Sequence, residues 1–362
     1  MGSYRGKSGK VYQLGEKIGA GGEGTVYLLE NNSGHVAKIF HDGTKNPEIM
    51  QNKIETMISM PIKPVIDNIL RVAWPEDILY EGTKFVGYVM PYVEAPYEIF
   101  YVYRDDAERE KIFPGYTWKY SVQYAYNLSW VVWYLHMNGI VIGDMNMKNV
   151  RIDAKGQVVL IDCDSFDIVN PKTKQHFPCI VGLQEMLAPE LQKVGSLSNG
   201  HFTKESDDFS LAIHIFRLLM KNADPFGAKL ISKRKSSKSE VNASEAIVNG
   251  ECVYVRNVQG KTTPDWVPPF DMLPADVQNA FRKTFDYTAL TALKNVKNRT
   301  TAEEWNRILL ELAKKEPNAN LTTCSKNRKH IYPAHNKKCP WCDATTVHDS
   351  RFMKGLRGFL GY

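Results

Sequence analysis

The sequence contains no apolar stretch long enough to cross a lipid bilayer. A membrane-spanning helix needs about 20 consecutive apolar residues. The best candidate, residues 211–220, is short and carries His214 and Arg217. The first residues also lack the charged and apolar segments of a secretory signal peptide. We therefore expect a cytoplasmic protein without a membrane partner.

Cysteine is scarce, which argues against a small secreted domain held by disulfides. The chain has six cysteines in 362 residues. Cys163, Cys179 and Cys252 are scattered through the body, while the other three lie close to the C-terminus. This distribution is typical of a reduced chain with one metal site.

Neither charge nor composition is extreme. Hydrophobic content of 43% and charged content of 24% are ordinary for a globular protein. The net charge of +6 favours anionic partners only weakly. At about 100–200 residues per domain, the length predicts two or three folding units.

The N-terminal part alternates β-like segments with glycine-rich turns. Alternating apolar and polar residues predict strands at residues 11–18, 25–30, 35–40, 70–73 and 85–90. A helix is predicted over residues 47–60, because Pro47 suits a first turn and apolar residues follow at helical spacing. These apolar residues are Ile49, Met50, Ile54, Met57 and Ile58.

After Val93 the pattern becomes mainly helical. The spacing predicts helices over residues 118–138, 204–220, 274–285 and 301–313, and short strands over 149–152 and 157–161. Thr300 is the expected N-cap of the last helix. The polar stretch 228–266 is interpreted as a solvated insertion, with a phosphate- or partner-binding patch as the alternative. Its basic residues are Lys229, Lys233, Arg234, Lys235 and Lys238.

A G-x-G-x-x-G motif followed by Val26 occupies the first predicted hairpin, with its glycines at Gly19, Gly21 and Gly24. Dinucleotide-binding folds share this motif, but there the glycines lie between a strand and a helix. Here a β-like segment follows, so the backbone N–H groups of a hairpin can lie over phosphates. A glycine-rich turn without a ligand is the alternative.

Lys38 lies among apolar neighbours on the third predicted strand. A lysine in such a place needs an anionic partner, for which phosphate and a helix carboxylate are both candidates. A lysine at a sheet edge that extends to water is the remaining alternative.

Asp144 and Asn149 follow an Asp-x-x-x-x-Asn spacing before one short strand, and Asp162 follows the next strand. With the glycine hairpin and Lys38, these residues resemble the protein kinase family in type, order and spacing. Further matches are the Ala-Pro-Glu that ends at Glu190, then Asp207 and Arg299; in this family Asp207 and an ion pair between Glu190 and Arg299 look structural. The resemblance covers roughly residues 10–315. It implies an α+β, bilobal protein-kinase-like fold, with a small antiparallel β lobe carrying one helix and a larger, mainly α lobe.

The resemblance also implies a role for each matching residue. Gly19, Gly21 and Gly24 would cover the ATP phosphates, and Lys38 would pair with the α- and β-phosphates. Glu55 would hold Lys38 from the helix, with Glu48 as the alternative. Asp144 would be the catalytic base, and Asn149 and Asp162 would bind Mg²⁺ or Mn²⁺. The remaining expected nucleotide-binding residues are Val26 and, in the hinge, Met90, Tyr92 and Val93.

Several positions depart from the family pattern. Ile142 and Gly143 replace the usual His-Arg, so activation through a phosphorylated loop paired to that Arg is not expected. Asn146 replaces a usual Lys and removes a positive charge near the γ-phosphate. Asp164 replaces a usual Gly and adds a negative charge beside the metal.

These segments are similar to a divergent bacterial kinase branch. That branch occurs with von Willebrand-type proteins and protein phosphatases in tellurite-resistance-linked phosphorylation systems, which makes such proteins expected partners beside protein substrates. An active Ser/Thr kinase is the leading hypothesis. An ATP-binding pseudokinase scaffold and a zinc-dependent nucleic-acid or partner adaptor are the alternatives.

Four residues near the C-terminus predict a structural zinc site: Cys324, His330, Cys339 and Cys342. Cys339 and Cys342 form a C-x-x-C knuckle, and the other two complete a tetrahedral set of soft or borderline ligands. His335 is the alternative to His330. A redox C-x-x-C would be expected near a βαβ unit, which the pattern does not show.

The expected domains are a kinase N-lobe (residues 10–93), a C-lobe (94–316), a zinc-binding module (317–345) and a basic tail (346–362). The tail mixes basic and aromatic residues, as some nucleic-acid-binding segments do. Packing of the tail on the protein is the preferred interpretation, and nucleic acid is the less favoured partner.

Overall fold

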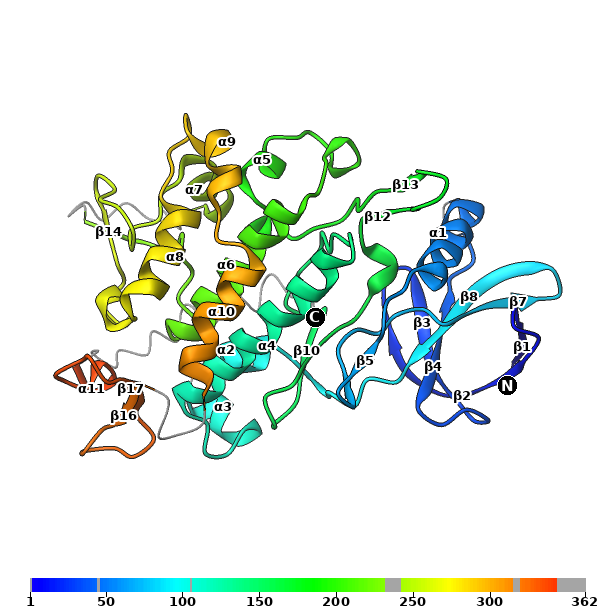
Figure 1. Ribbon diagram of the computed structural model, residues 1–362, viewed down its shortest axis with the longest axis horizontal. Helices are drawn as coiled ribbons and strands as arrows, with labels where there is room; N and C mark the ends of the chain where they lie inside the picture. Colours follow the sequence, from blue (N-terminus) through cyan, green and yellow to red (C-terminus); the bar gives the residue numbers. More distant parts are fainter. Residues whose placement is uncertain (1, 44–45, 105, 232–241, 315–319, 344–362) are drawn as a thin grey trace.

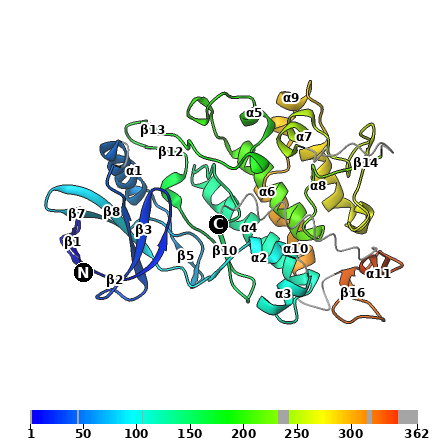
Figure 2. The ribbon, with the colours of Figure 1, turned by 180° about the vertical axis from the view of Figure 1, so that it is seen from behind.

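The computed structural model describes residues 2–43, 46–104, 106–231, 242–314 and 320–343. A β-rich lobe lies at one end and a larger helical lobe occupies the middle. A small C-terminal module sits against the helical lobe at the opposite end in both views (Figures 1 and 2). The two-lobed arrangement agrees with the predicted kinase-like fold.

The N-lobe is built on a closed antiparallel barrel with the strand order β1-β2-β3-β4-β8-β7. The strands are β1 (Ser3–Gly6), β2 (Val11–Ala20), β3 (Gly24–Leu29), β4 (His35–Phe40), β7 (Asp77–Glu81) and β8 (Lys84–Pro91). The predicted strands 11–18, 25–30, 35–40 and 85–90 are confirmed.

Two barrel strands, β1 and β7, were not predicted, and β1 precedes the expected lobe boundary at residue 10. Their pairing places Gly6 opposite Leu79 and closes the sheet. Asp77 stabilises this closure, because its carboxylate accepts hydrogen bonds from the Ser8 amide at 3.1 Å and the Tyr12 hydroxyl at 2.9 Å. The N-lobe therefore includes the start of the described chain.

The predicted strand 70–73 is wrong. Strands β5 (Val65–Ile66) and β6 (Ile69–Leu70) form a two-stranded hairpin, and Val72 makes a single β-bridge to Leu160. Val72, Ala73 and Trp74 are buried as an extended segment in the core. Their apolar character therefore reflects packing rather than strand pairing.

Helix α1 (Pro47–Ser59) is the one helix predicted for this lobe. Ile54 and Met57 are buried as expected, whereas Ile49 from the predicted stripe is 51% exposed. Lys53 lies on the buried face instead, at 5% exposure. The helix thus presents a cation, and not only apolar groups, to the interior of the lobe.

The C-lobe is organised by four longer helices that match the predicted ones. They are α4 (Trp118–Met137), α6 (Lys204–Leu219), α8 (Ala275–Phe285) and α10 (Ala302–Ala313). The N-cap of α10 is Thr301 rather than Thr300: its side chain accepts from the Glu304 amide in a capping box. Thr300 instead donates its hydroxyl to the Ala280 carbonyl at 2.7 Å.

Shorter elements complete the lobe and the module. Strands β9 (Tyr97–Glu98), β10 (Val150–Ile152) and β11 (Val158–Leu160) form one sheet, which confirms the two predicted strands. The other short elements are α2 (Phe100–Tyr103), α3 (Asp106–Ile112), β12 (Ile168–Val169), β13 (His176–Phe177), α5 (Pro189–Gln192), β14 (Lys229–Leu230), α7 (Ala243–Asn249), β15 (Lys261–Thr262), α9 (Ala292–Asn295), β16 (Leu321–Thr323), β17 (Ile331–Pro333) and α11 (Pro340–Asp343).

The tail 346–362 and the basic residues 233, 234, 235 and 238 lie outside the described residues. Within the described ranges, no helix combines the length and the apolar character that a bilayer crossing requires.

Candidate active site

The glycine hairpin connects β2 and β3. The Gly21 amide donates to the Gly24 carbonyl at 2.9 Å and closes the turn. A Cβ on Gly24 would lie 2.6 Å from the Ile39 carbonyl oxygen, so β3 needs glycine to approach β4 this closely. A Cβ on Gly21 would meet no atom within 4 Å, and one on Gly19 would lie 4.0 Å from Val26. Packing therefore explains Gly24 but leaves the turn at Gly21 open to a ligand.

Lys38 on β4 is buried against two carboxylates. Its Nζ donates to Asp162 Oδ1 at 2.6 Å and to both oxygens of Asp164 at 2.8 Å. Burial alone would lower the pKa of Lys38, but Asp164 and Asp162 raise it above its ordinary value. Lys38 therefore stays charged in its apolar surroundings.

Asp164 is the more deeply buried of the two carboxylates, at 1% exposure. Besides Lys38, it accepts a hydrogen bond from the Tyr88 hydroxyl at 2.7 Å. Burial opposes its ionisation, yet Lys38 and Tyr88 lower the pKa of Asp164 below its usual value. The side chain of Asp162 is 42% exposed, and burial and the nearby Asp164 charge raise its pKa. Asp162 is thus the carboxylate that faces the open side.

The predicted Lys38–Glu55 pair does not form in this structure. Glu55 pairs with Lys7 at 3.0 Å and accepts from Gln51 at 3.1 Å, while Glu48 is exposed. Asp164 takes the place of a helix carboxylate beside Lys38. The sequence singled out Asp164 as a departure from the family pattern, but did not reveal that it is the partner of Lys38.

The catalytic loop brings Asp144 together with two amide side chains. Asn146 Nδ2 donates to Asp144 Oδ2 at 2.7 Å, and Asn149 Nδ2 donates to the Asp144 carbonyl at 3.1 Å. Burial raises the pKa of Asp144, Asn146 opposes this rise, and the charge of Asp162 adds to it. Asp144, Asn149 and Asp162 therefore lie in one electrostatically connected site.

A buried carboxylate from α6 holds the backbone of this loop. Asp207 accepts from the amides of Ile142 at 2.7 Å and Gly143 at 2.9 Å. His136 of α4 lies 3.0 Å from the same carboxylate. This is the structural role that the family resemblance implies for Asp207.

Gly143 explains why no arginine precedes Asp144. Its φ is +76°, a conformation that disfavours side chains. An added Cβ would lie 2.6 Å from the Cys179 Sγ. Cys179 is fully buried and fills the space beside the loop. Cys179, from the segment after Asp164, thus occupies the space beside Gly143 where the family pattern would place an arginine side chain.

That segment is held by its own polar contacts. Asp167 pairs with His176 at 2.8 Å and accepts from the Cys179 amide at 3.1 Å. Asn170 Nδ2 donates to Thr56 Oγ1 of α1 at 2.9 Å. The β12–β13 hairpin is therefore held by contacts within its own segment and by a hydrogen bond to α1, and none of these contacts involves a phosphorylated residue.

The predicted hinge follows β8. Met90 is buried in β8, and the Tyr92 amide already donates to the Gly34 carbonyl at 2.8 Å. Val93 is half-buried and packs against the main core, as does Val26 across the glycine hairpin. The Tyr92 amide is thus already used by the protein, and Met90 is paired with Val36 of β4 in the sheet.

Arg299 and Glu190 form the predicted ion pair. Both guanidinium Nη atoms donate to the two carboxylate oxygens at 2.7 Å. The Arg299 side chain is 1% exposed and also lies 5.2 Å from the Phe209 ring. The pair joins the start of α5 to the segment before α10.

The four predicted zinc ligands gather at one point. The ligand atoms of Cys324, His330, Cys339 and Cys342 all lie within 4.8 Å of one another. His335 does not join them, because its Nε2 lies 3.2 Å from the Asp271 carbonyl of the C-lobe. Three thiols and one imidazole suit a tetrahedral zinc ion. The choice of His330 over His335 therefore agrees with the geometry.

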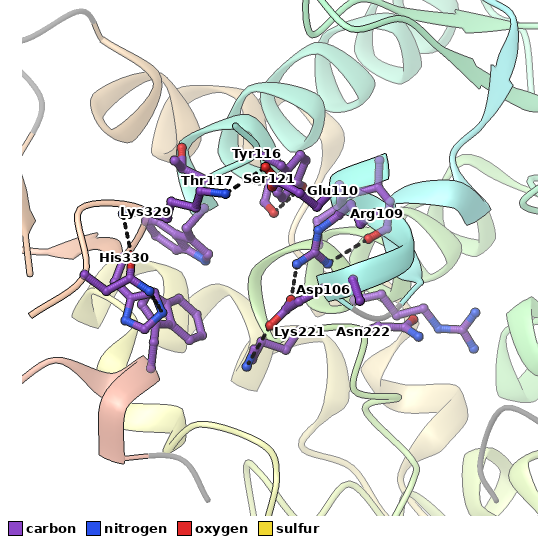
Figure 3. A pocket seen from close by; sticks show the side chains of 17 residues that line it. Asp106, Arg109, Glu110, Tyr116, Thr117, Ser121, Lys221, Asn222, Lys329 and His330 are labelled. Atoms are coloured by element: carbon purple, nitrogen blue, oxygen red, sulfur yellow. Dashed lines mark hydrogen bonds and ion pairs between the residues drawn. The ribbon is translucent and has the colours of Figure 1, made fainter. Parts of the chain in front are cut away.

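A cavity of about 460 Å³ lies between this module and the C-lobe (Figure 3). Lys329 of the module pairs with Glu110 of α3 at 2.7 Å, and Lys221 pairs with Asp106 at 3.7 Å. Lys221 also lies 5.8 Å from the Trp341 ring. No lining residue comes from the predicted nucleotide site. The cavity therefore marks the joint between the module and the C-lobe.

Comparison with known proteins shows the family to which the chain belongs. The protein kinase domain family matches residues 12–330. Protein kinase YegI of Escherichia coli K12 is 33% identical over 341 residues, which is 92% of this chain and 49% of that protein. Its counterpart in Escherichia coli O157:H7 is 32% identical over the same shares.

A more distant match is the probable serine/threonine-protein kinase PLK of Dictyostelium discoideum. It is 26% identical over 214 residues, which cover 58% of this chain and 20% of that protein. The chain spans about half the length of the YegI relatives.

Proposed function

This chain belongs to the protein kinase family, and we propose that it transfers the γ-phosphoryl group of ATP to Ser or Thr hydroxyls of protein substrates. The observations that carry the proposal are the 2.6 Å contact between Lys38 and Asp162 and the hydrogen bond that Asn149 donates to the Asp144 carbonyl at 3.1 Å. Phosphoryl transfer leaves little covalent work to the protein, so positioned charges and hydrogen bonds supply most of the catalysis.

Each of these side chains has a distinct proposed part. Asp144 accepts the proton of the substrate hydroxyl as its oxygen bonds to the γ-phosphorus and the bond to the β-phosphate oxygen breaks, releasing ADP. Its position is supported by the 2.7 Å hydrogen bond from Asn146. Lys38 pairs with the α- and β-phosphates, while the glycine hairpin covers them. Adenine would be bound at the hinge, where the Val93 backbone is the candidate donor.

Asn149 and Asp162 would hold Mg²⁺ or Mn²⁺. Carboxylate and amide oxygens are the hard ligands that these ions prefer, and the Asp162 side chain is 42% exposed toward solvent. The bound ion would neutralise charge on the phosphates. In this structure Asp162 is paired with Lys38. Binding of nucleotide and metal would separate the pair, with Lys38 contacting the phosphates and Asp162 contacting the metal.

The segment after Asp164 is proposed to be ordered without phosphorylation. Support comes from its contacts with His176, Thr56 and the catalytic loop, described above. Mass spectrometry of the active enzyme tests this directly. A phosphosite between Asp164 and Glu190 whose removal abolishes activity would overturn it.

The C-terminal cluster is proposed to bind one structural Zn²⁺ through Cys324, His330, Cys339 and Cys342. A closed set of four protein ligands leaves no open position for chemistry, so the ion would stabilise the module. Contacts across the joint, such as Lys329–Glu110, support a module that docks on the kinase body.

The partner proteins of the divergent bacterial branch form a finer part of the proposal. The resemblance of the sequence around Asp144 and Asp162 to that branch is what supports a von Willebrand-type protein and a protein phosphatase as partners. Copurification with each candidate, followed by a phosphorylation assay, would test them.

Incubation with radiolabelled ATP and Mg²⁺ or Mn²⁺ tests the central proposal. Asp144→Ala and Asp162→Ala should lose labelling, because one lacks the base and the other lacks a metal ligand. Asp271→Ala, an exposed C-lobe position, serves as the matched control. Equal labelling by wild type, Asp144→Ala and Asp162→Ala would refute the kinase assignment. Nucleotide binding without labelling in all proteins would favour an ATP-binding scaffold.

A further inference from the structure

Lys53 is a buried cation in α1 to which the proposed reaction gives no part. The residue is 5% exposed and lies next to the fully buried Ile54 on the same helix. Among the residues that the structure describes, it makes no hydrogen bond and no ion pair within 4.0 Å. Burial lowers its pKa below the usual lysine value. A lysine in such a place needs an anionic partner to stay charged.

The charges that act on Lys53 come from both sides of the nucleotide site. Asp164 and Asp167 follow β11, and Glu23 belongs to the glycine hairpin; the carboxylate charges of all three favour the charged form of Lys53. Geometry agrees with this: α1 contacts residues 163–165, and Thr56 on its buried face accepts a hydrogen bond from Asn170 at 2.9 Å. The buried side of α1 that carries Lys53 therefore meets the segment after β11.

Two of these carboxylates are already satisfied. Asp164 is bound to Lys38 and Tyr88, and Asp167 is bound to His176 and the Cys179 amide. Glu23 is exposed at the turn. Lys53 is thus near several carboxylates but forms an ion pair with none of those described. This is the arrangement expected of a cation that is available to bind an anionic ligand.

Two positions after Asp144, the catalytic loop carries an amide side chain instead of a cation. Asn146 stands where the family has a lysine, and both its amide nitrogen and its amide oxygen already make hydrogen bonds. It donates to Asp144 at 2.7 Å and accepts from the Lys148 amide at 2.8 Å. Lys148 itself is exposed. Lys38 is shared between two aspartates, so it cannot alone balance a triphosphate.

We propose that Lys53 binds the terminal phosphate of the nucleotide and supplies, from α1, the positive charge that Asn146 cannot supply. The ligand is a nucleoside triphosphate, and Lys53 binds its γ-phosphate, which a nucleoside diphosphate lacks. The proposal rests on the nucleotide-binding function proposed above. It makes α1 a direct contributor to phosphate recognition.

Discrimination between ATP and ADP tests the proposal, because a purely structural lysine would not distinguish them. Binding of ADP and of a non-hydrolysable ATP analogue, each with Mg²⁺, is measured by calorimetry on the full chain. Lys53→Met should weaken the ATP analogue about tenfold to hundredfold, the range expected for a charge-assisted hydrogen bond, and leave ADP within about twofold. Lys53→Arg should restore much of the preference.

Lys63→Met, at an exposed position just beyond α1, is the matched control and should bind both nucleotides as wild type does. Equal loss of ATP and ADP affinity in Lys53→Met, or no loss, would overturn the proposal. If Lys53→Met does not fold, by circular dichroism, Lys53→Gln replaces it, and the same ratio of affinities decides. Wild type that binds neither nucleotide would instead refute the proposed function, so the two failures are distinguishable.

Discussion

Lys38 is held by Asp164, whose two carboxylate oxygens both lie 2.8 Å from its Nζ, and not by a carboxylate of α1. The pair is almost completely buried, and Tyr88 supports it from β8. The lysine of the proposed nucleotide site is therefore anchored to the same loop that carries the metal-binding candidate Asp162. Movement of this loop would change the position of both groups together.

Asp164→Asn should destabilise the protein and reduce activity strongly. The substitution removes the more deeply buried of the two counter-charges of Lys38, and loss of one partner from a buried ion pair costs about 3–5 kcal/mol. Thermal unfolding and steady-state labelling measure the two effects. Glu55→Gln is the informative comparison, because Glu55 pairs only with the half-exposed Lys7 and such pairs contribute about 0–1 kcal/mol. A larger loss for Glu55→Gln than for Asp164→Asn would show that the assignment is wrong.

The pH profile of kcat/KM should report Asp144. Asp144 must be ionised to accept a proton, so activity is present above its pKa and is lost as pH falls through it. Burial raises this pKa, and the Asn146 hydrogen bond lowers it. Asn146→Ala should therefore move the acid limb to higher pH than in wild type. An unchanged limb, or one moved to lower pH, would contradict this assignment of the base.

Arg299→Ala should lower the free energy of unfolding by about 3–5 kcal/mol, because Glu190 would be left without its bidentate partner. Denaturant unfolding monitored by circular dichroism provides the measurement. Lys283→Ala breaks the exposed Lys283–Glu304 pair of the same lobe and should change stability by about 1 kcal/mol or less. Similar losses in both variants would indicate that burial does not set the strength of the Arg299 pair.

The module should contain one zinc ion per chain, measured by elemental analysis of the purified protein. A chelator should disorder it, since folding and metal binding are coupled in such small sites. Trp341, buried beside Cys339 and Cys342, offers the readout: its fluorescence should change on chelation, and a Trp341→Phe variant should lose that change. Cys339→Ser should reproduce the chelated state. Full zinc content in Cys339→Ser would argue against these ligands.

Much of the fold could be predicted because the longer helices and the barrel hairpins carry local signals. Apolar spacing located α4, α6, α8 and α10 within a residue or two, and the glycines marked the β2–β3 turn. The short strand β1 has no such signal, because its stability depends on Asp77, which is distant in the sequence. The N-cap of α10 was displaced by one residue because Thr300 and Thr301 are both good caps, and only tertiary contacts choose between them.

The candidate site was predicted less completely, and electrostatics explains the difference. The types and order of Asp144, Asn149 and Asp162 identify a family, but they do not say which carboxylate reaches Lys38. That choice depends on the burial of Asp164 and on the Tyr88 hydroxyl. Lys53 could have been noticed, because it lies four positions before Met57 on the apolar face of α1. A lysine at such a position is itself a signal.

The bond between Asn170 and Thr56 has a consequence for control in the cell. If α1 and the β12–β13 hairpin are already joined in the unmodified chain, phosphorylation of this segment would not be needed to join them. The amount of phosphorylated substrate would then depend on the concentrations of the kinase and its substrate and on the rate of dephosphorylation. We therefore expect the abundance of an opposing hydrolase, rather than the modification state of this chain, to govern the signal.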